Sequence, residues 1–321
     1  MHTPALLPDE LVGGYLERMA RLNGLESGRA VLQRLLDQPG RSRGPSACPT
    51  ALELVAKATN MEKAHLIRAH TLIPLTRLVA RDGATAPYGA PKHRRSERFG
   101  LSQTLDPGAW RCAQCVSEDI QFWGFPYERR SANLPGIDWC TKHGLQLAYR
   151  GTDGQASTNK VLKLTSFERR YAEILETLLV QPHPVSMDSA VDRLRSRARD
   201  LGMGWRRFGA DVRVAASKLS QLAMACTPKG WEERHRKRQS EWRYSDIGKV
   251  LWMPLAPYQA DMYAFALTVL FDSADAACSA FLQGYRPDDL IELARRARLE
   301  QTNRARHSRH ATRIGARNVK T

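Results

Sequence analysis

The chain of 321 residues lacks an apolar run long enough to cross a bilayer. Its longest such run, Met262 to Phe271, is far shorter than the roughly 20 residues that a membrane-spanning helix needs. Residues Met1 to Ala20 also lack the basic start, apolar centre and small-residue cleavage site of a secretory signal. We therefore expect a cytoplasmic protein with no membrane partner.

Signatures of common enzyme classes are missing as well. No alternating strand-and-helix pattern, phosphate-binding glycine loop or acidic cluster with two-metal spacing is present. The sequence has no internal repeat of the kind that a solenoid requires. Outside residues 110–149, few segments show the alternating pattern of a strand. These absences favour a mainly α protein that is not an enzyme.

Acidic residues are too few to balance the basic ones. Lys and Arg number 49 against 33 Asp and Glu, which gives a net charge of +16. Such an excess indicates a polyanionic partner, with nucleic acid as the first candidate and the nucleoid as the location. A solvated charged face is the alternative, but residues 295–321 hold nine basic residues and one acid, whereas a solvated face mixes both signs. The candidate nucleic-acid contacts are Lys63, Arg68, Arg234, Arg236, Lys237, Arg238, Arg304, Arg306, Arg309 and Arg313.

Helical spacing of apolar residues predicts four regions. A first helix starting at Pro8 and Asp9 and a second over Gly28 to Leu36 open the chain. We expect an N-terminal helical region over 1–105, a small zinc-ribbon-like module over 106–150, a helical C-terminal domain over 151–285 and a basic C-terminal helix or tail over 286–321.

Residues 50–72 predict a helix-turn-helix. Thr50 can cap one helix, Asn60 tolerates a left-handed turn, and a second helix from Glu62 to Leu72 would point Leu66 and Ala69 inward. That helix would present Lys63, Arg68 and His70 to DNA. Helix pairs of this kind also occur as plain packing units, and their surface can meet protein instead.

Four residues form the most specific pattern of the chain. Cys112 and Cys115 make a C-x2-C pair, and Cys140 and His143 follow as a C-x2-H pair after 24 intervening residues. Each spacing lets a tight turn present two side chains to one tetrahedral ion, and three thiolates with one imidazole complete a structural Zn²⁺ site. Zinc binding would be coupled to folding of the module, because so short a segment buries little apolar surface.

Other cysteines and aromatics receive no functional role. Cys48, Cys226 and Cys278 lack partners at this spacing, and we expect small buried residues. The aromatic residues in 122–127 are expected in the core of the module rather than as a surface that stacks on bases.

Several short motifs in the first 150 residues can be compared with those of known protein families. They are Leu7-Pro8-Asp9-Glu10, Ala56-Lys57-Ala58-Thr59-Asn60-Met61, Cys112-Ala113-Gln114-Cys115 with Glu118-Asp119, Asn133-Leu134-Pro135-Gly136, and Cys140-Thr141-Lys142-His143. Together they closely resemble the TniQ family of transposition proteins. The sequence departs from the family at Ala113, where many relatives have proline, and at Gly13-Gly14-Tyr15, where a serine-tryptophan pattern is usual.

This resemblance implies a non-catalytic target-site selection protein. Such proteins link target DNA, or a CRISPR effector with its guide RNA, to an AAA+ regulator of the TnsC or TniB type and through it to transposase. Only the zinc ligands Cys112, Cys115, Cys140 and His143 carry over residue by residue, and a homodimer is also implied. Direct and RNA-guided targeting both remain open at this point.

Two other classes compete with this interpretation. A zinc-containing helix-turn-helix transcription regulator would use the same basic surface at a promoter. An enzyme would use Cys112 and Cys115 as a redox pair or a Cys/His nucleophile, but the C-x2-H pair already accounts for both thiols as metal ligands.

Overall fold

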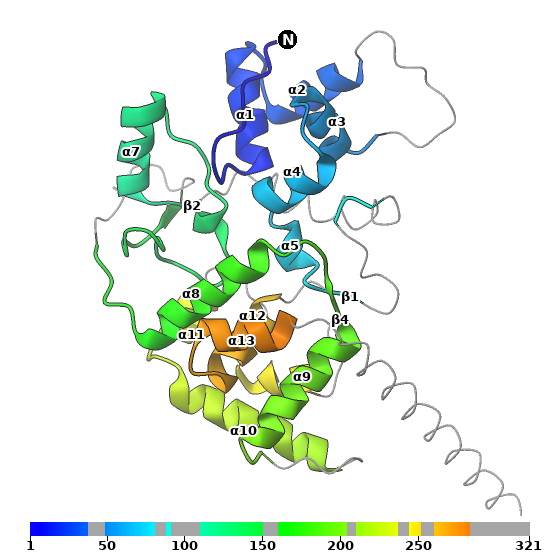
Figure 1. Cartoon of the computed structure of the whole chain (residues 1–321). Coiled ribbons are helices and arrows are strands. Elements are labelled where there is room, and N and C mark those ends of the chain that lie inside the picture. The colour runs from blue at the N-terminus through cyan, green and yellow to red at the C-terminus, as the bar shows by residue number, and fades with distance from the viewer. Residues whose placement is uncertain are drawn as a thin grey trace, which may run out of the picture. The chain divides into compact units, whose positions relative to one another are not determined.

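Helices dominate the computed structural model, which confirms the expected mainly α class (Figure 1). The residues that it describes are 1–37, 49–80, 88–90, 110–149, 160–203, 210–236, 244–251 and 260–282. The chain divides into one compact unit over Met1–Phe281 and a second over Leu282–Thr321. Apart from Leu282, the second unit lies outside the described residues.

The N-terminal helices pack against one another in chain order (Figure 1). They are α1 (Val12–Leu22), α2 (Gly28–Leu36), α3 (Ala51–Ala58), α4 (Lys63–His70) and α5 (Ile73–Thr76). Apolar residues at helical spacing place a shared core between them, which includes Tyr15, Leu16, Met19, Val31, Leu52, Val55, Leu66 and Ile67. Helix α1 begins at Val12 rather than at Pro8, because Asp9 takes a positive φ of 59° that no helix tolerates.

Helices α3 and α4 form the predicted helix pair. Thr50 and Glu53 cap α3 with a reciprocal capping box. Asn60 then turns the chain with φ 52°, as its identity predicted, and Leu66 is buried. The expectation for Ala69 was wrong: it is half-buried, and Ile67 occupies the interior instead.

Residues 110–149 fold around short elements. Strands β2 (Trp110–Arg111) and β3 (Ala148–Tyr149) pair antiparallel, with Trp110 opposite Tyr149. Between them lie α7 (Ala113–Trp123) and the 3₁₀ helix η2 (Ser131–Asn133). The buried cluster here is small and includes three cysteines; its members are Cys112, Cys115, Ala132, Cys140, Leu145 and Leu147.

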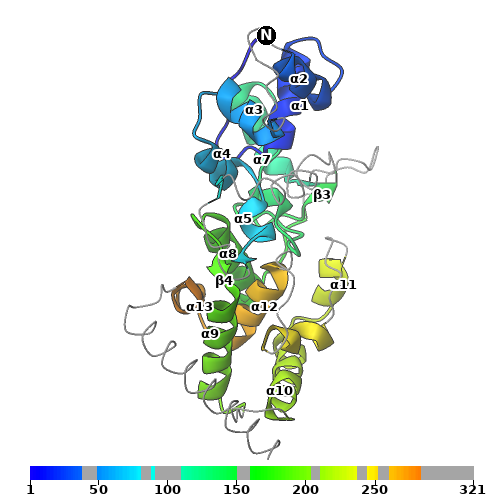
Figure 2. The ribbon, with the colours of Figure 1, turned by 90° about the vertical axis from the view of Figure 1, so that its right-hand side faces the viewer.

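The C-terminal part of the larger unit is helical. Its elements are α8 (Ser166–Leu179), α9 (Met187–Asp200), α10 (Ala210–Cys226), α11 (Trp231–Arg236), the 3₁₀ helix η3 (Tyr244–Leu251), α12 (Ala260–Leu270) and α13 (Ala274–Leu282). Helix α12 contacts α8, α9 and α10, and Figure 2 shows it between α9 and α10. A two-residue parallel pair, β1 (Val79–Ala80) with β4 (Val185–Ser186), ties this part to the N-terminal helices.

An aromatic cluster fills the centre of this helical part. Trp231 is fully buried, stacks on Phe265 at 5.1 Å between ring centroids, and meets Phe167 and Tyr171 edge-on at 5.7 and 5.1 Å. Helix α11 is therefore fixed to α8 and α12 by large apolar contacts.

Among the described residues, no helix is both long and apolar enough to cross a membrane.

Candidate metal centre

Two tight turns bring the predicted ligands together. Cys112 is the residue before α7 and Cys115 lies in its first turn, so both thiols leave the same end of the helix. Cys140 and His143 lie in a second turn that is closed by the Gly144 amide on the Cys140 carbonyl at 2.8 Å. Gly144 has a φ of 65°, which favours glycine at this position. The three thiols are buried and His143 is half-buried.

The distances between the four side chains fit a tetrahedral ion. The Cys115 and Cys140 sulfurs are 3.7 Å apart. His143 Nδ1 lies 3.5, 3.4 and 3.6 Å from the sulfurs of Cys112, Cys115 and Cys140. For zinc bonds of about 2.3 Å to sulfur and about 2.0 Å to nitrogen, a regular tetrahedron has S···S edges of about 3.8 Å and S···N edges of about 3.5 Å. The donor set and its spacing therefore fit Zn²⁺.

The chemistry available to such a centre is structural. Three thiolates and one imidazole fill the four positions that zinc prefers, which leaves none for a water or a substrate. The bound ion would join the start of α7 to the turn at Cys140, in addition to the small buried cluster that both segments share.

Protons are distributed unevenly over the thiols. A hydrogen bond from the Cys115 thiol lowers the pKa of Cys140 to about 5, whereas the same contact, together with burial, raises the pKa of Cys115. Burial also raises the pKa of Cys112. Zinc binding would release the protons of those thiols that are still protonated, because a metal-bound cysteine is a thiolate.

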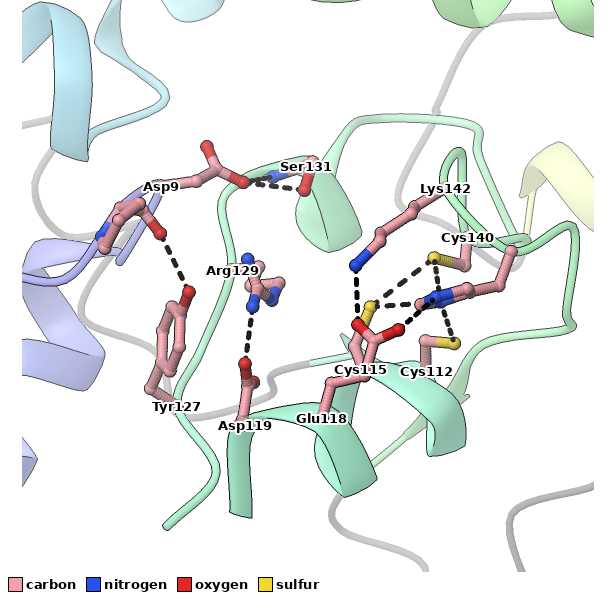
Figure 3. Close-up of polar contacts among 12 residues, drawn as sticks. Asp9, Cys112, Cys115, Glu118, Asp119, Tyr127, Arg129, Ser131, Cys140 and Lys142 are labelled. Carbon is pink, nitrogen blue, oxygen red and sulfur yellow. Dashed lines mark hydrogen bonds and ion pairs between the residues drawn. The ribbon is translucent and has the colours of Figure 1, made fainter. Parts of the chain in front are cut away.

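The segment before α1 forms hydrogen bonds with the module that contains the metal ligands. The Asp9 carboxylate accepts hydrogen bonds from the Ser131 amide at 3.0 Å, the Ser131 hydroxyl at 2.6 Å and Arg130 Nε at 3.1 Å. The Tyr127 hydroxyl donates to the Pro8 carbonyl at 3.0 Å. Figure 3 shows Asp9 between Tyr127 and Ser131.

Backbone contacts strengthen this junction. The Leu11 amide donates to the Glu128 carbonyl at 2.9 Å, and the Arg130 amide donates to the Asp9 carbonyl at 2.8 Å. A Cβ at Gly14 would lie 2.8 Å from Glu128 Cβ, so the unusual glycine pair in α1 allows the module to approach closely. Sequence reasoning missed this junction, because Asp9 and Ser131 are separated by 122 positions and share no local pattern.

Buried ion pairs flank the junction on both sides. Glu10 is fully buried, and its carboxylate accepts from Arg18 Nε at 2.8 Å and Arg18 Nη2 at 2.7 Å. On α7, the buried Asp119 accepts from Arg129 at 2.5 Å, while the Arg129 guanidinium lies 4.5 Å from the centre of the Tyr127 ring. Position Asp119, four residues after Cys115 on the same helix, was part of the family motif but carried no assigned role.

Predicted nucleic-acid contacts are placed as follows. Lys63 is in an ion pair with Glu53 at 3.3 Å, and Arg68 is half-buried. Arg234 is paired with Asp138 at 3.4 Å and with Glu168. The remaining candidates lie outside the described side chains: Arg236, Lys237, Arg238, Arg304, Arg306, Arg309 and Arg313.

The expectation that His70 of α4 points outward was wrong. His70 is 6% exposed, and its Nδ1 donates to the Glu10 carbonyl at 2.9 Å. Its position near the end of α4 turns it toward the segment before α1 rather than toward solvent.

Aromatic residues and spare cysteines only partly follow expectation. Tyr127 is buried as predicted, but Phe122 and Trp123 are 77% and 39% exposed, because they extend from the end of α7 beyond the small core. Cys278 is buried, whereas Cys226 is exposed at the end of α10. Cys48 lies outside the described residues.

Comparison with known proteins gives one assignment. Residues 1–147 match the sequence model of the TniQ family. The matched segment includes the N-terminal helices and all four predicted metal ligands. No curated protein matches the chain.

Proposed function

Because residues 1–147 belong to the TniQ family, which is associated with DNA transposition, we propose that this protein selects the target site for a transposon without catalysing strand transfer. It would link the target, either DNA itself or a CRISPR effector bound to guide RNA, to an AAA+ regulator of the TnsC or TniB type and so to transposase.

The observation that carries this proposal is the junction inside the matched segment. The buried Cys/His cluster and the N-terminal helices meet through Asp9, Arg130 and Ser131. Hydrogen bonds of this kind hold the module and the N-terminal helices together, as we would expect of a protein that joins two partners.

The metal site supports a non-catalytic role. A closed Cys₃His site stabilises the fold around it and gives no activated water for strand cleavage. Bond breaking and joining therefore belong to the transposase in this proposal.

The proposed DNA contact comes from the basic segments rather than from the described cations. Lys63 and Arg234 form ion pairs with acidic side chains, so their charges are partly neutralised. The basic tail over 295–321 instead contains nine Lys or Arg residues and a single acidic residue. Each phosphate that is neutralised steepens the dependence of log affinity on log salt by about 0.9.

A salt titration of DNA binding tests this contact. Replacing Arg304, Arg306, Arg309 and Arg313 by glutamine should weaken binding of a labelled duplex, measured by fluorescence anisotropy, and lower the salt slope by up to about 3.6. A control variant with glutamine at two exposed arginines of α2, Arg29 and Arg34, should keep the slope. An unchanged slope in the tail variant would contradict the assignment of DNA binding to the tail.

A reconstituted transposition assay tests the function as a whole. With transposase, the AAA+ regulator and donor DNA present, omission of this protein should abolish insertion at the selected target, and the protein should bind the regulator in a pull-down assay. Insertion that requires a guide-RNA complex would assign RNA-guided targeting; insertion without it would assign direct targeting.

A transcription regulator is the second candidate, because α3 and α4 are joined by a short turn at Asn60, as a helix-turn-helix would require. A footprint at a single operator, together with no binding to the AAA+ regulator, would favour it over the adaptor. Light scattering of the purified protein tests the homodimer that we include in the adaptor proposal.

A further inference from the structure

Glu118 lies on α7 three residues after Cys115, which places both side chains on one face of the helix. Its carboxylate has two partners, both from the second ligand turn. Oε1 lies 3.0 Å from His143 Nε2, and Oε2 accepts from Lys142 Nζ at 2.6 Å. Figure 3 draws Glu118 beside Lys142 and the cysteines.

The two nitrogens of His143 face different groups. Nδ1 lies within 3.6 Å of the sulfurs of Cys112, Cys115 and Cys140, so it is the nitrogen that would bind the ion. A metal-binding imidazole nitrogen must carry no proton, and the proton of neutral imidazole then resides on Nε2. Nε2–H points at the Glu118 carboxylate and can donate to it.

We propose that Glu118 is a positioning residue of the metal centre, holding His143 in the orientation and tautomer that present Nδ1 to the ion. The proposal rests on the zinc assignment made above. The carboxylate also joins the two ligand pairs outside the coordination sphere, since it extends from the helix of Cys115 to the turn of His143. Outer carboxylates of this kind raise the basicity of a ligating histidine and fix its ring.

Lys142 completes the arrangement electrostatically. A zinc ion with three thiolates and a neutral imidazole carries one net negative charge, which disfavours a carboxylate nearby. The Lys142 ammonium, 2.6 Å from the other oxygen of Glu118, offsets this repulsion.

A surface ion pair without effect on the metal is the competing explanation. The Glu118 and Lys142 side chains are 39% and 62% exposed, and exposed pairs contribute little to stability. His143 is different, because only 9% of its side chain is exposed, so its contact with Glu118 is largely shielded from water. The explanations differ in what happens at the imidazole.

The experiment measures zinc affinity of the full-length protein by competition with a chromophoric chelator. Glu118→Gln should weaken zinc binding by about tenfold or more, with one zinc still bound at saturation. Long-range proton–nitrogen NMR correlations of His143 should show Nδ1 bound and Nε2 protonated in the natural protein, and a loss or shift of the Nε2–H signal in the variant.

Matched variants separate the explanations. Asp192→Asn removes an exposed ion pair on α9, Asp192 with Arg195 at 3.5 Å, and should leave zinc affinity unchanged. Lys142→Met should weaken affinity less than Glu118→Gln and keep the Nε2–H signal. Equal affinities for Glu118→Gln and Asp192→Asn, or zinc on Nε2 in the natural protein, would overturn the proposal. Absence of zinc from the natural protein, by elemental analysis, would instead remove the metal assignment itself.

Discussion

The module around the metal ligands and the helical part after it are stabilised in different ways. In residues 110–149, three of the six members of the buried cluster around the ligands are themselves candidate metal ligands, while Leu134, Ile137 and Trp139 are buried outside this cluster. In residues 160–282, the rings of Phe167, Tyr171 and Phe265 pack on Trp231 and form an aromatic core. The first region should depend on zinc and the second on apolar burial.

Removal of zinc gives the largest expected effect and the sharpest separation of the two regions. A chelator, or Cys140→Ser, should unfold residues 110–149, because zinc contributes on the order of 10 kcal/mol in apparent terms to such modules. Hydrogen exchange should report lost protection there, while the helices α8, α9 and α12 stay protected.

Cys226→Ser is the control for this experiment, since Cys226 is exposed and remote from the ligand set. It should change neither zinc content nor exchange. Simultaneous loss of protection in both regions after chelation would show that the two are not stabilised separately.

Removal of the Trp231 side chain tests whether the helical part, residues 160–282, depends on apolar burial. Trp231→Ala should lower the free energy of unfolding of the helical part by about 3–5 kcal/mol, because a fully buried indole is lost and a cavity remains. Urea denaturation followed by near-UV circular dichroism measures the change, and zinc content should stay the same. Phe122→Ala, at a side chain that is 77% exposed, should change stability by less than about 0.5 kcal/mol.

The hydrogen bonds of Asp9 test whether the zinc module and the N-terminal helices stabilise each other. Asp9→Ala removes the acceptor for Ser131 and Arg130, which should cost about 1.5–3 kcal/mol since a charged group loses its hydrogen bonds. Exchange protection should fall on both sides of the junction, at residues 7–15 and 127–133, with zinc still bound. Asp9→Asn, which keeps one acceptor and tolerates the positive φ, should have a smaller effect.

Local sequence signals predicted many of the helices and the grouping of the four candidate ligand side chains. The C-x2-C and C-x2-H spacings predicted four side chains whose ligand atoms all lie within 4.8 Å of one another, and Thr50 and Asn60 predicted the start of α3 and the turn after it. These features depend on residues a few positions apart, where the backbone limits the possible geometries.

Contacts between distant segments could not be predicted in this way. The partners of Asp9 are over 120 positions away, and Glu118 reaches His143 across 25 positions. The exposure of Phe122 and the burial of His70 also depend on which segment covers each helix face. A single sequence gives the spacing along a helix but not the neighbour that packs on it.

The smallest expected effect is a dependence of stability on pH. It should appear in the N-terminal helices, which contain His70, and not in the helical part around Trp231. Burial lowers the pKa of His70 below its usual value, and Arg130 and His65 lower it further, while the Glu10 carbonyl and Asp9 act in the opposite direction. Since the unfolded chain binds the proton more tightly, the stabilisation by neutral His70 is complete above about pH 6.5 and is lost as the pH falls toward the folded pKa.

Comparison of the natural protein with His70→Gln isolates this effect, because Gln can still donate to the Glu10 carbonyl but does not titrate. Between pH 7.5 and pH 5.5, as about one unit on either side of the usual histidine pKa, the natural protein should lose more exchange protection in α1 and α4 than the variant does. The helices around Trp231 should respond equally in both proteins, because the rings that pack there come from Phe167, Tyr171 and Phe265 and not from His70. A gain in stability of the natural protein over His70→Gln as the pH falls would instead mean that His70 binds its proton more tightly in the folded state than in the unfolded chain.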